Sequence, residues 1–201
     1  FAKSLDELGF QLISTGGTAR KLKDAGLSVI SVSEVTGHPE IFDGRVKSLH
    51  PAIHGPLLAR LESAEDRVGL AELGYGPINL VACNLYPFSE AASQQPRLDD
   101  PELLEMVDIG GPTMVRASAK NHRNVIIVCN PINYSSVIAE LKAAGSSDAV
   151  SSQFRQNLAL EAFEHTAGYD SAISGELHAR WIGRPETFDA KSEQEQRLPA
   201  A

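Results

Sequence analysis

The chain has 201 residues, of which 42% are apolar, and this is enough to bury the core of one globular domain. Its 18 basic and 26 acidic residues give a net charge of -8, which argues against a nucleic-acid-binding surface, so an anionic ligand has to meet a local cluster of cations. No apolar run approaches the ~20 residues of a membrane span. Cys83 and Cys129 lie in apolar runs as buried, reduced thiols would, so we expect a cytoplasmic protein without a nucleic-acid or membrane partner.

Helix-like and strand-like segments alternate in the first part of the chain. Residues 1–8 have one apolar helical face that ends at Gly9, and residues 10–14 resemble a short strand. The turn S-T-G-G-T then precedes a helix that ends at Gly26, and the next strand follows at 28–32. This rhythm predicts an α/β fold with a mostly parallel sheet and helices on both faces. Because such a sheet normally opens with a strand, we expect one upstream of Phe1.

The continuous apolar runs that begin at Ile78 and Asn124 are typical of central strands covered on both faces. Residues 152–181 are strongly helical, with glycines at 168 and 175 that are expected to interrupt the helix. After residue 183 the composition becomes polar, which predicts one domain over 1–183 and a tail or linker over 184–201. Other helices are predicted at 52–60, 66–73, 101–106, 111–121 and 131–143. A buried helical stripe is predicted for Tyr169, Ile173, Leu177 and Trp181.

The turn formed by Thr15, Gly16, Gly17 and Thr18 lies between a predicted strand and a predicted helix. Glycines let backbone amides approach a ligand, and a helix N-terminus favours an anion, so the turn is a candidate phosphate site. The alternative is an ordinary turn in which Thr18 caps the helix.

The segment F-D-G-R-V-K-S-L-H-P-A-I-H-G places two cations in a loop before a helix. Arg45 offers a planar fork for a phosphate or carbonyl group, and Lys47 offers a compact charge that can move a proton. His50 and His54 are spaced as a metal pair, but no Glu follows His50 and no third ligand is evident. The pattern therefore favours His50 as a cap for a helix that begins at Pro51.

The segment N-L-Y-P-F follows the carboxyl end of a predicted central strand, where open α/β sheets bind ligands. Asn84 and Tyr86 can donate hydrogen bonds there. The alternative is that the aromatic side chains only close the core, and we prefer this interpretation for Phe88.

The segment V-D-I-G-G-P-T-M-V-R-A-S-A-K-N-H begins with a carboxylate at a helix entrance. Arg116 and Lys120 are one turn apart on that helix. Asp108 can be a simple helix cap, but a carboxylate close to two cations on a helix of small and apolar residues predicts a charged cleft.

These segments, together with A-F-E-H-T-A-x-Y-D-x-A-I, resemble the IMP cyclohydrolase domain of the bifunctional purine-biosynthesis enzyme that also carries AICAR formyltransferase. The resemblance extends from Phe1 to about Trp181 and implies a methylglyoxal-synthase-like fold. It implies ring closure of 5-formamidoimidazole-4-carboxamide ribotide to IMP with loss of water. It implies no cofactor and no metal, and it allows a homodimer. Formyltransferase activity is not expected, because that domain's signature is absent from these residues.

The resemblance also implies the roles of individual residues. Lys120 is the expected proton donor or acceptor, and Lys47, Tyr86 and Asp108 line the reacting centre. Substrate contacts are implied for Thr15, Gly16, Gly17, Thr18, Arg45, Ser48, Cys83, Asn84, Ile109 and Gly110. Ser48 replaces the threonine that is usual in the family and keeps its hydroxyl. Two alternatives stay open: a methylglyoxal-synthase-like phosphate lyase, and a non-catalytic module that binds a nucleotide or sugar phosphate.

Overall fold

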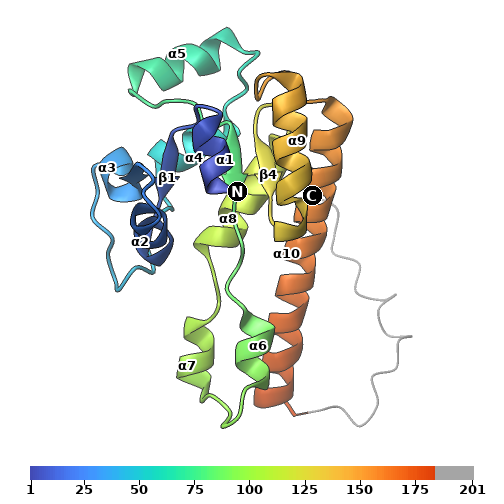
Figure 1. Cartoon of the computed structure of the whole chain (residues 1–201). Helices are drawn as coiled ribbons and strands as arrows, with labels where there is room; N and C mark the ends of the chain where they lie inside the picture. The colour runs from blue at the N-terminus through green and yellow to red at the C-terminus, as the bar shows by residue number, and fades with distance from the viewer. Residues whose placement is uncertain (184–201) are drawn as a thin grey trace.

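The computed structural model describes residues 1–183, in which helices surround two short parallel sheets (Figure 1). β1 (Leu12–Ser14) pairs with β2 (Val29–Ser31), and β3 (Leu80–Ala82) pairs with β4 (Ile126–Val128). The predicted α/β class and parallel pairing are confirmed, but the strands of the described part form two pairs and not one central sheet. The helices are α1 (Ala2–Glu7), α2 (Gly16–Asp24), α3 (Val32–Thr36), α4 (Pro51–Leu58), α5 (Ala64–Glu72), α6 (Phe88–Ser93), α7 (Asp100–Glu105), α8 (Gly110–Lys120), the 3-10 helix η1 (Pro131–Asn133), α9 (Tyr134–Ala144) and α10 (Ser152–Trp181).

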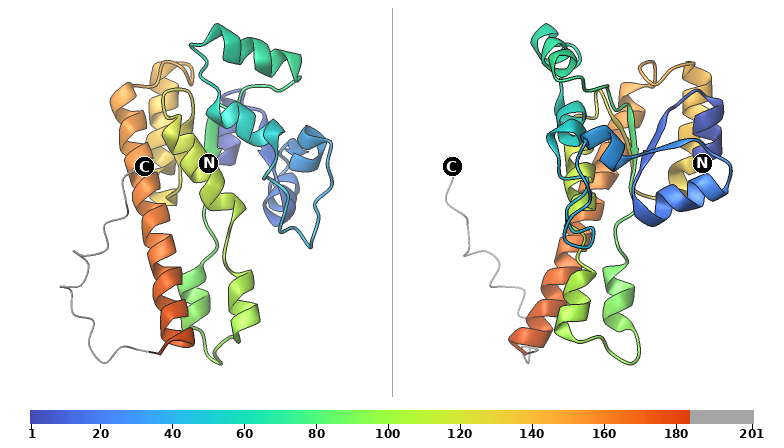
Figure 2. Two further views of the ribbon diagram at one scale, coloured as in Figure 1. Left: turned by 180° about the vertical axis from the view of Figure 1, so that it is seen from behind. Right: turned by 90° about the vertical axis from the view of Figure 1, so that its left-hand side faces the viewer.

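β4 lies at the centre of the main core. Ile126, Ile127 and Val128 are each 1% exposed, because α1 and α9 pack on one side of β4 while α8 and α10 pack on the other (Figures 1 and 2). The expectation of a strand covered on both faces is therefore confirmed for β4. It is wrong for β3, whose residues are half-buried or exposed. β3 has a strand neighbour on one side only, so its other side is covered less completely.

Two helices were not predicted. α3 follows β2 directly and begins with a capping box, in which Ser31 Oγ accepts a hydrogen bond from Glu34 N at 3.1 Å and Glu34 Oε2 accepts one from Ser31 N at 3.2 Å. This S-x-x-E spacing is visible in the sequence, but β-branched residues on both sides favoured a strand. α6 begins at Phe88, directly after Pro87.

α4 begins as predicted, with His50 as its cap. His50 Nδ1 accepts a hydrogen bond from Ala52 N at 3.1 Å, and Pro51 occupies the first helical position. His54, the second histidine of the pair with metal-ligand spacing, is half-buried, and burial lowers its pKa. Because the His50 ring faces the helix backbone, its role is to start α4 behind the loop that carries Lys47.

α6, α7 and the C-terminal half of α10 form a three-helix arm, which projects from the rest of the molecule at the bottom of Figure 1. Phe88 and Leu103 are 1% and 0% exposed and pack with Tyr169 of α10. At the far end of the arm, Arg180 Nη1 lies 3.0 Å from Asp100 Oδ1, and Arg180 Nε lies 2.7 Å from Glu176 Oε1. The arm therefore has an apolar interior around Phe88 and Leu103 and an ion-pair network at its tip.

α10 is one uninterrupted helix of 30 residues, so the predicted breaks at Gly168 and Gly175 are wrong. α10 packs against α8, β4 and α6, and this packing stabilises the helix as a whole although both glycines are exposed. The predicted buried stripe is half-buried at Tyr169 and fails at Trp181, which is 56% exposed. Trp181 lies at the end of the arm, and its Nε1 donates a hydrogen bond to Asp100 Oδ2 at 2.9 Å.

Near its other end, α10 carries a buried cation that closes the preceding loop. Arg155 is 4% exposed and donates hydrogen bonds to the backbone carbonyls of Val150, His122 and Ser147. In residues 1–183, none of the helices combines the length and the apolar character that crossing a bilayer would require. The predicted tail, 184–201, lies outside the described residues.

Candidate active site

Three of the predicted site segments meet at the first turn of α8. Ser48 is 4% exposed, and a Cβ atom at Gly110 would lie 2.8 Å from Ser48 Oγ. A Cβ atom at Gly111 would lie 2.2 Å from Asp108 Oδ2 and 2.9 Å from Leu85 Cδ2. The glycine pair therefore lets two distant loops and the Asp108 carboxylate approach the start of α8.

The Asp108 carboxylate is fixed on one side and open on the other. Its Oδ1 accepts a hydrogen bond from Gly111 N at 2.9 Å, so the carboxylate caps the N-terminus of α8, where the helix dipole favours a negative charge. Its Oδ2 accepts no hydrogen bond from residues 1–183 and stays available for a ligand. The cap predicted as the simpler interpretation is thus present, and it leaves one oxygen for chemistry.

The loop with Arg45 and Lys47 is tied to the end of α7. Arg45 Nε donates to Glu105 Oε2 at 3.1 Å, Arg45 Nη2 contacts the other oxygen, and this hydrogen bonding lowers the pKa of the Glu105 carboxyl. Both side chains are more than half exposed, so the pair contributes little to stability and an anionic ligand can replace Glu105 at small cost. Lys47 is half-buried, and its Nζ is 3.7 Å from the point that a Cβ of Gly44 would occupy.

The loop after β3 is held by the neighbouring strand and helix. Asn84 Nδ2 donates to the Cys129 carbonyl at 3.3 Å, and Asn84 Oδ1 accepts from Tyr134 Oη at 3.0 Å. Burial, with a smaller contribution from the Asp108 charge, raises the pKa of the Cys83 thiol to about 12, so Cys83 faces the site as a neutral thiol. The Tyr86 side chain is 44% exposed and does not close the core.

A cavity of about 550 Å³ lies beside this loop, on the side of α10. It adjoins Asn84 and Tyr86 but not Lys47 or Asp108, so it extends the candidate site away from the first turn of α8. It is lined by residues 84–90 and 129–131 and, from α10, by Glu161, Glu164, His165 and Tyr169. In the segment A-F-E-H-T-A-x-Y, the sequence predicted a role only for Tyr169, as part of a buried stripe; the structure places both His165 and Tyr169 at this cavity.

The turn 15–18 belongs to a different part of the molecule, beside the β1–β2 pair. Thr15 is the N-cap of α2 without a side-chain cap bond, and Thr18 lies inside the helix, so the alternative of a Thr18 cap is wrong. Gly16 has φ +46°, a conformation that other residues rarely adopt. Within residues 1–183, no hydrogen bond joins this turn to the three segments at α8.

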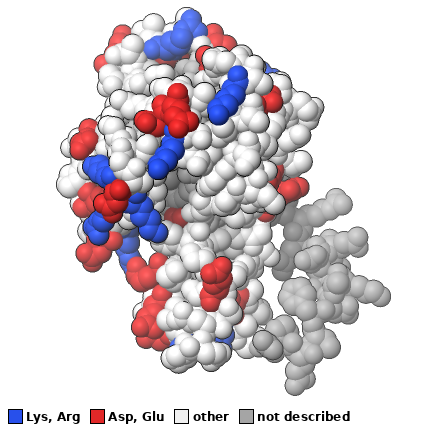
Figure 3. Space-filling view, in the orientation of Figure 1, with Lys and Arg blue, Asp and Glu red and all other residues white. Residues whose placement is uncertain are grey.

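Charge is distributed unevenly over the face shown in Figure 3. On the part that contains α2 and the loop before α4, Lys and Arg alternate with Asp and Glu, whereas the visible charges of the arm below are mostly acidic. In the sequence, α2 and this loop contain Arg20, Lys21, Lys23, Arg45 and Lys47 together with Asp24, Glu40 and Asp43. The cations of this acidic chain near the loop of Ser48 are therefore interleaved with carboxylates.

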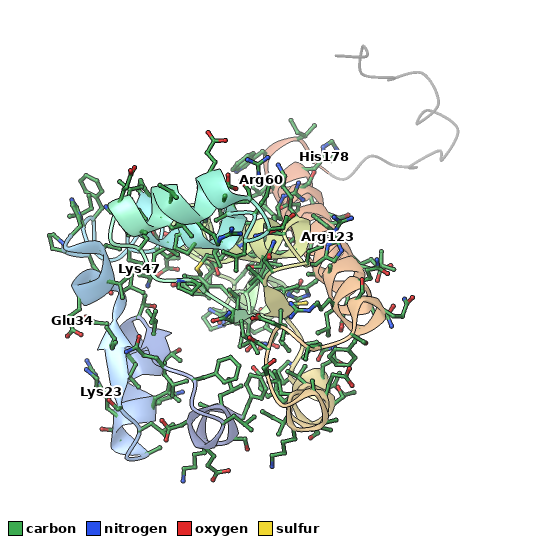
Figure 4. All side chains as sticks on the ribbon, turned by 90° about the horizontal axis from the view of Figure 1, so that it is seen from above. Lys23, Glu34, Lys47, Arg60, Arg123 and His178 are labelled. Carbon is green, nitrogen blue, oxygen red and sulfur yellow. The ribbon has the colours of Figure 1, made fainter. Side chains whose placement is uncertain are left out.

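The predicted charged cleft around Asp108 is wrong as far as Arg116 and Lys120 are concerned. The Arg116 guanidinium lies 5.8 Å from the centre of the Phe163 ring of α10. Lys120 is exposed at the last position of α8, about 15 Å along the helix axis from Gly110 at the standard helical rise. Figure 4 shows Arg123, which follows Lys120 by three residues, beside α10, whereas Lys47 lies nearer to α3. The one-turn spacing of Arg116 and Lys120 indicates which face of α8 they occupy. It does not bring them to Asp108, because Asp108 lies at the N-terminus of α8 and Lys120 is its last residue.

Two family models match consecutive parts of the chain. The model of the MGS-like domain matches residues 1–113, and the model of the AICARFT/IMPCHase bienzyme matches residues 118–199. The chain is 53% identical to the bifunctional purine biosynthesis protein PurH of Persephonella marina and 52% identical to that of Sorangium cellulosum. These matches cover 90% and 88% of this chain but 34% and 33% of the relatives, so the chain spans about a third of their length.

A solved structure supports the fold directly. The crystal structure of ForH superposes with a TM-score of 0.80 at 37% identity and covers 89% of both chains. The methylglyoxal-synthase-like fold expected from the sequence is thereby confirmed. Because the MGS-like model matches more than half of the residues, and the relatives just described share half of their aligned residues with it, the chain belongs to the MGS-like family and matches a part of the bifunctional purine biosynthesis proteins.

Proposed function

We propose that this chain is an IMP cyclohydrolase that closes the ring of 5-formamidoimidazole-4-carboxamide ribotide in the cytoplasm. The observation that carries the proposal is the meeting of Ser48, Leu85 and Asp108 at the first turn of α8, which brings three separate sequence motifs to one place. The relatives named as purine biosynthesis proteins support the same reaction sequence.

The reaction joins two groups of one molecule. The carboxamide nitrogen attacks the formyl carbon, a new C–N bond forms, and the formyl oxygen takes the negative charge before it is protonated and leaves as water. An amide nitrogen is a weak nucleophile, so the protein has to hold the two groups together, accept a proton from nitrogen and stabilise the oxyanion. No electron transfer occurs, so the reaction needs no redox cofactor, and we propose that side chains of the protein, without a metal, stabilise the charge on the oxygen.

The open oxygen of Asp108 is placed to accept a hydrogen bond from the carboxamide and to orient its nitrogen. The Lys47 ammonium group is the charged donor for the developing oxyanion, since a single such donor lowers a barrier by about 3 kcal/mol. Tyr86, whose side chain is exposed beside the cavity, donates to the ring substituents. Together these three residues form the proposed reacting centre.

Substrate binding uses the remaining predicted residues. We propose that the ribotide phosphate binds the amides and hydroxyls of Thr15, Gly16, Gly17 and Thr18 at the N-terminus of α2, where the free N–H groups and the helix dipole favour an anion. Arg45 exchanges its Glu105 partner for the ligand. The purine ring precursor contacts Ser48, Cys83, Asn84, Ile109 and Gly110.

Lys120 requires a second chain. About 15 Å along α8 separates it from the first turn, so it does not reach the Asp108 carboxylate of its own chain. We propose a homodimer in which Lys120 from one copy acts as the proton donor or acceptor at the site of the other.

Turnover of the formylated ribotide to IMP by the purified protein, without folate or metal, tests the function. Asp108→Asn and Lys47→Met should each lower kcat about 100-fold, because each removes a group from the reacting centre. Asp170→Asn and Lys142→Met, at exposed positions on α10 and α9, are the matched controls and should be unchanged. Full turnover in both site variants would refute the proposal.

Mixing two inactive variants tests the shared site. When Asp108→Asn and Lys120→Ala chains are unfolded together and refolded, half of the dimers are mixed and have one intact site out of two, so about a quarter of the wild-type activity should return. If both residues act within one chain, no activity returns.

The same assay separates the two alternatives. A phosphate lyase would release inorganic phosphate from dihydroxyacetone phosphate, and a binding module would bind IMP without converting the ribotide. No observation on the site favours either over ring closure.

A further inference from the structure

The backbone at Asp108 is held by a side chain from a distant helix. Tyr169 Oη accepts a hydrogen bond from Asp108 N at 2.8 Å and donates one to the Met106 carbonyl at 3.2 Å. One hydroxyl therefore bridges the chain on both sides of Val107, where the arm ends and α8 is about to begin. Asp108 is therefore held by two hydrogen bonds. Its backbone N donates to Tyr169 Oη, and its side-chain Oδ1 accepts from Gly111 N.

The Tyr169 ring is itself anchored. It packs edge-to-face on Phe88, with 6.5 Å between ring centres and 75° between ring planes, and Phe88 is 1% exposed. Phe88 follows Tyr86 by two residues, so Tyr169 contacts both the segment that carries Tyr86 and the segment that carries Asp108. Burial raises the pKa of the Tyr169 hydroxyl, which keeps its proton for the Met106 carbonyl at neutral pH.

We propose that Tyr169 is a positioning residue that sets the Asp108 carboxylate in its reactive orientation. The inference rests on the proposed ring closure. Tyr169 acts through the Asp108 backbone, whose hydrogen bonds decide where the open oxygen points. A shift of the carboxylate changes the alignment of the amide in the transition state more than the affinity for a substrate whose phosphate is bound at residues 15–18, away from Asp108.

Tyr169→Phe removes the hydroxyl and keeps the ring on Phe88. The expected result is a fall in kcat of roughly tenfold with KM within about twofold of the wild type. Tyr75→Phe is the matched control, because the Tyr75 hydroxyl has no hydrogen-bond partner among residues 1–183, and it should leave both constants unchanged. Melting temperatures of both variants show whether the fold is retained.

A double-variant cycle separates positioning from a general effect on structure. If Tyr169 acts through Asp108, Tyr169→Phe has no further effect on kcat in an Asp108→Asn background. An unchanged kcat in the single variant, or the same tenfold loss in both backgrounds, overturns the proposal.

A readout that needs no turnover keeps the two proposals distinct. Hydrogen exchange of the Asp108 amide, followed by NMR, should become at least tenfold faster in Tyr169→Phe than in Tyr75→Phe. Absence of turnover in the wild type would refute the proposed function alone. Unchanged exchange of the Asp108 amide would refute the role of Tyr169.

Discussion

Replacing Gly111 by alanine tests the packing on which the candidate site is built. The added Cβ atom would lie 2.2 Å from Asp108 Oδ2, so the carboxylate has to move by about 1.2 Å to reach ordinary contact at 3.4 Å. That movement breaks the hydrogen bond from Gly111 N to Oδ1, which contributes about 1.5–3 kcal/mol because its acceptor is charged. The reacting centre loses the orientation of its carboxylate at the same time.

The opposing effect is the higher helix propensity of alanine. Alanine in a helix is more favourable than glycine by about 0.5–1 kcal/mol, so the net loss for Gly111→Ala is about 0.5–2.5 kcal/mol. For a domain of this size, that loss lowers the melting temperature by roughly 1–10 °C. Urea unfolding and calorimetry measure it, and kcat for ring closure should fall at least tenfold.

Gly168→Ala is the matched control. Gly168 also lies inside a helix, and a Cβ atom there would meet nothing within 4 Å, so only the gain in propensity remains. The two glycine variants should therefore shift stability in opposite directions. Adding Asp108→Ala to Gly111→Ala removes the clash with the carboxylate and leaves only the contact with Leu85 Cδ2 at 2.9 Å, so Gly111→Ala should cost less stability in the Asp108→Ala background than in the wild type. If Gly111→Ala is as stable and as active as Gly168→Ala, the close approach of the carboxylate to α8 is refuted.

Three further predictions follow from buried and charged groups. Arg155→Met leaves three backbone carbonyls without their donor and should cost about 2–4 kcal/mol in urea unfolding, whereas an unchanged midpoint would show that the guanidinium is not needed. Hydrogen bonds from Arg180 lower the pKa of the Asp100 and Glu176 carboxyls. The stabilisation from these contacts is therefore present above the ordinary carboxyl pKa of about 4 and is lost as the pH falls below it. Asp100→Asn should accordingly reduce the loss of stability between pH 7 and pH 3. Burial raises the pKa of Cys83 and Cys129 to about 12 and about 11, so iodoacetamide at pH 8 should modify both thiols much more slowly in the folded protein than in urea.

Local patterns predicted those parts of the fold that depend on neighbours in the sequence. The helix that begins at Pro51 behind a His50 cap, the buried run of β4 and the core position of Phe88 all follow from capping, hydrophobicity and turn residues. β3 shows where this reasoning ends. Its apolar run is equivalent to that of β4, but burial depends on how many elements cover a strand, and its sequence does not contain that information.

The site shows the same division. The residue types of Ser48 and Asp108 and their neighbouring glycines could be read from the sequence, and the structure brings them to one helix turn. The surroundings of Lys120 could not be predicted. Spacing along a helix gives the face of the helix and the axial distance between two residues, but it does not tell which other element packs beside each residue. Tyr169 was noted only as part of an apolar stripe, since a hydroxyl that bridges residues 61 and 63 positions away leaves no local pattern.

The helices of the arm hold the loops that carry the proposed site residues. The segment that contains α6 and α7 leaves β3 through Asn84 and Tyr86 and returns to α8 through Asp108, so both connections of this segment carry proposed site groups. Loops at such junctions would be mobile if they were held only by local contacts. Here the C-terminal half of α10 runs beside α6 and α7, contacts α6 through the Tyr169 ring and fixes the segment before α8 through the same residue's hydroxyl. A single continuous helix therefore holds two site loops in one register, and a break at Gly168, directly before Tyr169, would release both.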